Sequence, residues 1–161
     1  MPRSDYEVRI TPSVLDRLID EEPEISREPP ASRAKNLRQL KQSVRRDLEW
    51  LLNTRQWIEE IPPELEETRR SLATYGLPDF SALSVNSPAD QKAMRRLIED
   101  EIRFFEPRLI DVEISLETAR DAERSLHFRI NARLRVDPSP EPVVFDTTVH
   151  LFKGEYTVRG E

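Results

Sequence analysis

The 161-residue sequence contains no cysteine, only three glycines and no long apolar run. The absence of cysteine excludes disulfides, thiolate metal sites and a cysteine nucleophile. The glycines, at positions 76, 154 and 160, are too scattered to form a glycine-rich loop that binds phosphate. No stretch of eighteen apolar residues occurs, and the first ten residues lack the apolar core of a signal peptide. We therefore expect a soluble, cytoplasmic protein that is not inserted in a membrane.

Basic residues are also in the minority, with 25 Lys and Arg against 31 Asp and Glu, which gives a net charge of −6. Nucleic-acid binding needs clustered cations that neutralise phosphates, so this balance argues against it. Binding to a basic protein stays open. The length fits one ordinary domain with its own core.

Recognisable catalytic sets are lacking as well. Two histidines, His127 and His150, fall on the polar faces of expected strands, and no spacing typical of a metal site occurs. Adjacent carboxylates such as Asp100-Glu101 are common, but most of them lie in charge-rich helical stretches with no apolar wall to raise a pKa. The sequence predicts no cofactor, no metal and no enzyme activity.

What the chain does contain begins with a proline-rich arm. Residues 1–33 carry Pro12, Pro23, Pro29 and Pro30, and one apolar patch, SVLDRLID at 13–20, long enough for a turn or two of helix. We expect a flexible arm at 1–33 and a single domain at 34–161.

Three helices are expected in the first part of that domain. The first spans roughly 35–53, where apolar residues recur at helical spacing; the second spans 64–76 and ends at Gly76; the third spans 88–105 with Ser87 as its N-cap. The third helix is expected to bury Met94, Leu97, Ile98, Ile102 and Phe105.

The spacing then changes to strict alternation, which is typical of strands with one wet face. Ile110, Val112, Ile114 and Leu116 face one way in the first strand, and further strands are expected at 126–136, 143–151 and 155–159. The polar face of the first strand is acidic and that of the second is basic, so cross-strand pairs are expected. The predicted fold is α+β, with N-terminal helices packed on one face of a mostly antiparallel four-stranded sheet.

Two features are candidate contact sites. Glu106-Pro107-Arg108 marks the change from helix to strand, because proline ends the helix. A glutamate at a helix C-terminus opposes the helix dipole and requires a cation, either Arg108 or an arginine of a partner. The motif is therefore either a structural stop or a contact that offers the Arg108 guanidinium to a carboxylate.

The second candidate is the last strand, which is either a short protected edge or an acceptor for a strand from another chain. Its residues are Glu155, Tyr156, Thr157, Val158 and Arg159.

Three stretches occur in an order and spacing that resemble the TssE family, the baseplate wedge subunit of bacterial type VI secretion systems. They are SVRRDLEWLLNTR at 43–55, SLATYGLPDFS at 71–81 and IRFFEPRL at 102–109. The resemblance runs from about residue 13 to the C-terminus. It extends to a contractile-phage wedge protein often labelled lysozyme-like.

The resemblance implies a structural protein without lysozyme activity, in a cytoplasmic baseplate docked at the inner membrane. It implies that Glu106, Pro107 and Arg108 contact the wedge subunits TssF and TssG, and that TssK and the sheath proteins TssB and TssC are further partners. It also implies that the last strands start the first sheath ring by strand addition.

Three hypotheses follow. A wedge component predicts that Arg108→Ala leaves the fold intact and weakens wedge assembly. A muramidase would clear a suspension of cell walls. A small anti-adaptor-type regulator would have no secretion genes beside its own. The SVRRDLEWLLNTR and YGLPDFS motifs favour the first hypothesis.

Overall fold

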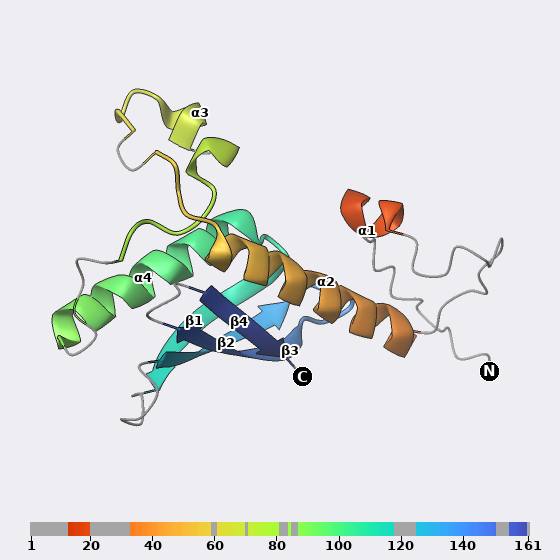
Figure 1. Cartoon of the computed structure of the whole chain (residues 1–161). Coiled ribbons are helices and arrows are strands. Elements are labelled where there is room, and N and C mark those ends of the chain that lie inside the picture. The colour runs from red at the N-terminus through yellow and green to blue at the C-terminus, as the bar shows by residue number, and fades with distance from the viewer. Residues whose placement is uncertain are drawn as a thin grey trace, which may run out of the picture.

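The computed structural model describes residues 13–19, 33–58, 61–69, 71–80, 84, 87–117, 125–150 and 155–160. Helices precede a four-stranded antiparallel sheet, which confirms the predicted α+β class (Figure 1). The elements are α1 (Val14–Leu18), α2 (Arg33–Asn53), α3 (Glu66–Arg69), the 3-10 turn η1 (Leu72–Thr74), α4 (Pro88–Phe105), β1 (Leu109–Glu117), β2 (Ser125–Leu134), β3 (Glu141–His150) and β4 (Glu155–Gly160). Within these ranges, no helix is long and apolar enough to cross a bilayer.

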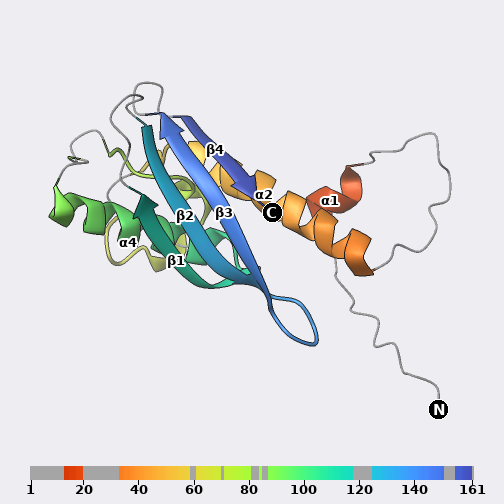
Figure 2. The same cartoon turned by 90° about the horizontal axis from the view of Figure 1, so that it is seen from below.

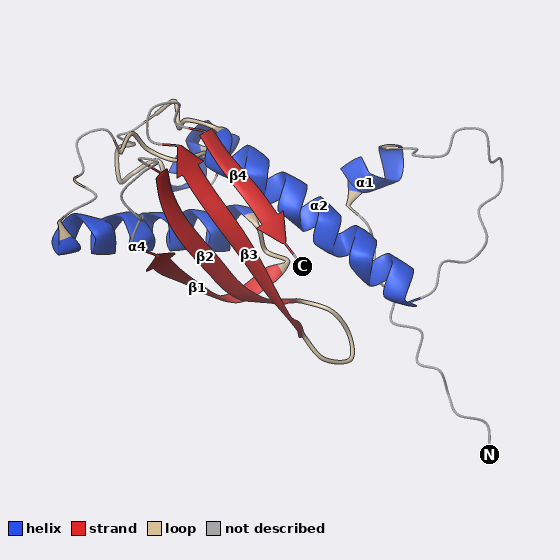
Figure 3. Cartoon of the chain, turned by 60° about the horizontal axis from the view of Figure 1, so that its bottom comes forward, coloured by secondary structure: helices blue, strands red, loops and turns tan. Residues whose placement is uncertain are grey.

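The sheet is a meander in the order β1-β2-β3-β4, with each strand antiparallel to the next. Figures 2 and 3 show the two long helices together behind one face of the sheet, with the other face open. Helix α2 packs along β4, and α4 packs along β1. The two helices therefore lie next to the two edge strands of the sheet.

The core lies between these helices and the sheet, and the helical spacing predicts most of it. On α2, Val44 and Leu48 are fully buried; on α4, Ile98 and Ile102 are buried, and Phe105 packs against the core. The prediction for Leu97 is wrong, because its side chain is 39% exposed. The buried residues of α4 are spaced four apart, at Met94, Ile98 and Ile102, and Leu97 does not belong to this series.

The prediction of a helix at 64–76 is also wrong, since among the described residues of this segment only the single turns α3 and η1 form. Ser71 lies just before η1, and its hydroxyl accepts a hydrogen bond from the Ala73 N–H and caps η1. Gly76 has φ +110° and comes after the short turn η1, so the helix that it was expected to end is not there. The connections between β1 and β2 and between β3 and β4 lie outside the described residues, as do residues 1–12 and 20–32 of the expected arm.

Strand β1 departs from simple alternation at a β-bulge between Ile110 and Glu113. Asp111 has a positive φ of 53°, which aspartate tolerates better than most residues. Because of the bulge, Leu109 takes the buried position that alternation assigns to Ile110, which is only half-buried.

Charged pairs cross the open face of the sheet, in part as predicted. Arg133 on β2 lies 3.3 Å from Asp111 on β1. Arg129, also on β2, pairs instead with Asp146 on β3 at 2.7 Å. His127 forms a hydrogen bond with Thr148. The side chain of His150 lies outside the description.

Candidate functional site

The Glu106-Pro107-Arg108 elbow joins α4 to β1. The last helical hydrogen bond runs from the Glu106 N–H to the Ile102 carbonyl at 2.8 Å, and Pro107 follows without a donor of its own. The Leu109 N–H then bonds to the Glu106 carbonyl, and the Arg108 carbonyl accepts from the Arg135 N–H. The helix therefore stops where the proline predicts, and the elbow is fixed to the start of the sheet.

The cation that compensates Glu106 is Arg108 itself. Its Nε donates to Glu106 Oε1 at 2.6 Å, and its Nη2 donates to Glu106 Oε2, in a two-pronged pair. Glu106 is only 4% exposed, so this pair neutralises a buried carboxylate. The sequence left open whether the cation is Arg108 or an arginine of a partner, and the structure shows that it is Arg108.

Helix α2 forms the wall behind the elbow. Arg108 Nη2 also donates to Asp47 Oδ2 at 2.5 Å, and Nη1 donates to the Ser43 hydroxyl at 3.3 Å. Burial alone would lower the pKa of Arg108, but hydrogen bonds and charge from Glu106 and Asp47 outweigh it and raise the pKa. Arg108 therefore stays charged at any physiological pH.

The motif does not present a free guanidinium. The Arg108 side chain is 24% exposed and is already engaged, whereas Pro107 is exposed. This changes the expectation that Arg108→Ala leaves the fold intact. The surface that the elbow offers to solvent is Pro107, held rigid by the pair on either side of it.

Helix α1 reaches the same cluster. The carboxylate of Asp16 lies 2.8 Å from Arg46 Nη2 and 3.9 Å from Arg108 Nη1. Ser13 forms a capping box with Asp16, which fixes that side chain at the start of the helix. Burial pushes the pKa of Asp16 up, but hydrogen bonds from Ser13 and Arg46 outweigh this effect, and the pKa is lowered.

The three stretches singled out in the sequence converge at this end of the molecule. Ser43 and Asp47, from the first stretch, contact Arg108 in the third. Tyr75, from the second, packs edge-on against Phe105 with ring centroids 5.1 Å apart. The segment after α2 also forms a parallel bridge between Arg55 and Leu77.

The edge of β4 is partly engaged by α2. Asn53 accepts a hydrogen bond from the Tyr156 N–H and donates one to the Tyr156 carbonyl, both at 2.8 Å. The side-chain amide thus occupies the place of one residue of a neighbouring strand. Of the predicted edge residues, Val158 faces the core, while Thr157 and Arg159 are exposed.

Replacing Asn53 by alanine tests this contact. Losing both hydrogen bonds, each worth about 1 kcal/mol, should speed hydrogen exchange of the Tyr156 amide roughly thirtyfold. Exchange followed by NMR measures this, with the Ile130 amide in central strand β2 as the control. Equal exchange rates in variant and wild type would show that Asn53 does not protect this edge.

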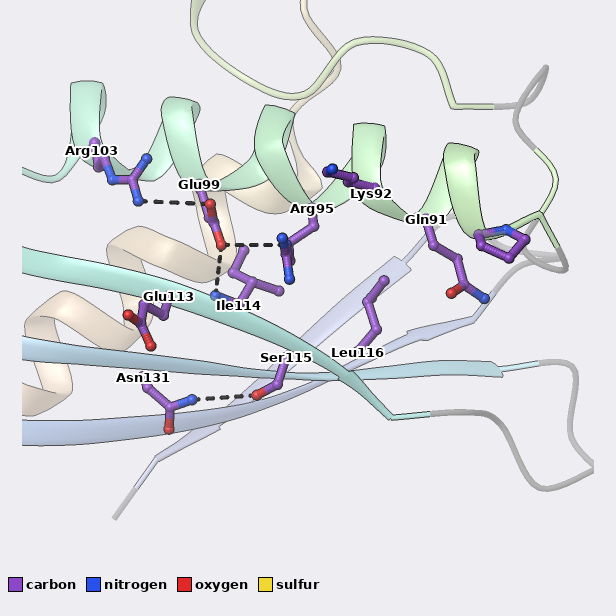
Figure 4. Close-up of a pocket in the computed structure, with 11 residues that line it drawn as sticks. Gln91, Lys92, Arg95, Glu99, Arg103, Glu113, Ile114, Ser115, Leu116 and Asn131 are labelled. Atoms are coloured by element: carbon purple, nitrogen blue, oxygen red, sulfur yellow. Dashed lines mark hydrogen bonds and ion pairs between the residues drawn. The ribbon is translucent and has the colours of Figure 1, made fainter.

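The opposite edge, β1, is engaged by α4 in a similar way (Figure 4). Glu99 accepts from the Ile114 N–H at 2.9 Å, and Arg103 donates to the Val112 carbonyl at 2.7 Å. Beside them lies a cavity of about 860 Å³ between α4 and β1. No cluster of described residues is suited to hold a metal ion.

Sequence reasoning missed the residues that pair with the elbow and with β4. The apolar spacing of the helix expected at 35–53 places Arg46 and Asp47 largely on the side opposite to its apolar face, and no local pattern gives Asp16 or Asn53 a pairing role. Asp16 and Arg46 are 30 residues apart, and Asn53 and Tyr156 are 103 apart, so no local pattern indicates either contact.

Comparison with known proteins gives one match to a protein family. A family model described as baseplate wedge protein gp25 matches residues 38–139, well over half of the chain. The match contains most of α2, the elbow and strands β1 and β2. No curated protein matches the sequence.

Proposed function

Because the chain belongs to the baseplate wedge protein gp25 family, we propose that it is the TssE-type wedge subunit of a bacterial type VI secretion baseplate. Membership makes it a structural, non-enzymatic component of the baseplate of a contractile, tail-like machine. The assignment to type VI secretion goes further. It rests on the three stretches at 43–55, 71–81 and 102–109.

The observation that carries the proposal is that these stretches meet in space. They pack together around the elbow, with Arg108 paired to Asp47 and Tyr75 packed on Phe105. The buried Glu106–Arg108 pair fixes the direction in which Pro107 points. A rigid, exposed corner suits a docking contact, since little conformational entropy is lost when it binds.

The proposed partners at this corner are the wedge subunits TssF and TssG, with TssK as a further baseplate partner. The complex would lie in the cytoplasm at the inner membrane. The sheath proteins TssB and TssC are the proposed partners of β4, through strand addition. An incoming strand would either displace Asn53 from Tyr156 or pair beyond it, next to Val158 and Arg159.

The experiment that tests the wedge contact places a photo-activatable phenylalanine analogue at Pro107. We expect illumination of the assembled complex to give a covalent adduct with TssF or TssG, because residue 107 is the exposed member of the elbow. Mass spectrometry of the adduct identifies the partner and the peptide.

A further inference from the structure

A binding position for a carboxylate lies beside the elbow and is filled by the chain itself. It consists of the Arg46 guanidinium and Arg108 Nη1, which we call the carboxylate seat. Asp16 of α1 occupies it, 2.8 Å from Arg46 and 3.9 Å from Arg108. The Asp16 side chain is 15% exposed, so it is largely withdrawn from water.

The body of the protein does not need Asp16 for charge balance. Without it, the two cations Arg46 and Arg108 face two carboxylates, Asp47 and Glu106, and the cluster is neutral. Asp16 adds a third carboxylate and makes the cluster net negative. The seat therefore accepts one acidic group more than neutrality requires.

The helix that supplies Asp16 is weakly attached. Helix α1 has five residues, too few for a stable helix on its own. Val14 and Leu18 are 73% and 77% exposed, so of its apolar side chains only Leu15, which is 38% exposed, helps to hold it in place. Partly exposed ion pairs add only a little stability, since solvent screens them. A partner with a larger contact surface can therefore displace α1.

We propose that the carboxylate seat binds an Asp or Glu side chain of the partner wedge subunit, and that Asp16 occupies the seat as an internal competitor in the free chain. This inference rests on the proposed wedge contact at the elbow. It adds the chemistry of the partner residue and a mechanism that keeps the seat filled before assembly.

The surroundings of the seat indicate what accompanies that carboxylate. The Arg46 guanidinium lies over the Trp50 ring, 5.2 Å from its centroid, and Trp50 is 52% exposed. Pro107 is exposed at the elbow. The seat thus lies beside apolar surface, and the matching partner segment has an acidic residue next to an apolar one, as α1 has Asp16 next to Leu15.

The test is Asp16→Asn in the full chain, which removes the charge and keeps the shape. The probe is the TssF–TssG complex of the same bacterium, with affinity measured by titration calorimetry. Removing a competitor held by at most about 1 kcal/mol should tighten binding roughly two- to fivefold. Trypsin should also cut the Arg17–Leu18 bond faster. The matched control is Asp146→Asn, which replaces an exposed carboxylate on the open face of the sheet. It should change neither the affinity nor the rate of tryptic cleavage.

A second variant separates competition from a fold defect. Arg46→Gln removes the main cation of the seat, so it should weaken binding, and adding Asp16→Asn to it should have no further effect. Unchanged or weaker binding by Asp16→Asn alone would overturn the inference, because α1 would then be neutral or part of the interface. Failure of the wild-type chain to bind TssF–TssG would instead overturn the proposed function.

Discussion

Replacing Arg108 by alanine is expected to destabilise the fold by about 3 kcal/mol, because it leaves a buried carboxylate without its cation. Glu106 is 4% exposed and takes both prongs of the guanidinium, and Asp47 loses a partner at the same time. For a domain of this size, the melting temperature should fall by about 6–12 °C. Thermal and urea unfolding followed by circular dichroism measure the change.

The matched control is Arg133→Ala on the open face of the sheet. Arg133 pairs with Asp111, but both side chains are about half exposed or more, so the expected loss is below about 1 kcal/mol. Removing Glu106 together with Arg108 should recover part of the stability, since no buried charge is then left unpaired. If Arg108→Ala and Arg133→Ala lost equal free energy of unfolding, the structural role of the Glu106–Arg108 pair would be refuted.

This result bears on how the elbow is tested. An assembly defect in Arg108→Ala would mix a loss of contact with a loss of folding. Pro107 is the better position to probe, because it is exposed and lies between the two paired residues.

Replacing Gly76 by alanine is expected to cost at least about 2 kcal/mol. Gly76 has φ +110°, a backbone conformation that residues with a Cβ rarely adopt. An added Cβ would lie 2.4 Å from the Thr54 carbonyl oxygen, which is backbone and cannot move aside easily. That oxygen also accepts a hydrogen bond from the Leu77 N–H at 2.8 Å, so the strain would reach buried Leu77.

Urea unfolding measures this effect. Ser84→Ala, at an exposed loop position, is the control and should stay within about 0.5 kcal/mol of wild type. If Gly76→Ala also stayed in that range, the close approach between residues 54 and 76 would not be a real constraint on the fold.

Regular periodicity accounts for the parts of the fold that were predicted correctly. Strong apolar spacing predicted α2, and the Ser87-Pro88 start and Pro107 bounded α4, since capping and proline effects act over a few residues. Alternation predicted four strands with ends that differ by one or two residues from those observed. The prediction of a helix at 64–76 was wrong because the hydrogen bonds of Ser71 compete with a continuous helix.

The contacts that the sequence did not predict join residues far apart in the chain. The proline was recognised from the sequence, and so was Arg108 as one of two candidate partners of Glu106, but the further partners of Arg108 come from α2 and α1. Which charged residues on α2 face the elbow depends on how that helix is rotated against the sheet. That rotation is set by packing of the whole core, so local spacing indicated a solvated face for Asp47.

Photo-cross-linking from position 107 tests the central claim most directly, since it asks whether the elbow touches another wedge subunit. The account predicts adducts with TssF or TssG from position 107 and none from Val144, which is 41% exposed and lies away from the elbow on strand β3. A folded chain that assembles with these subunits yet gives adducts from position 144 and none from 107 would contradict it.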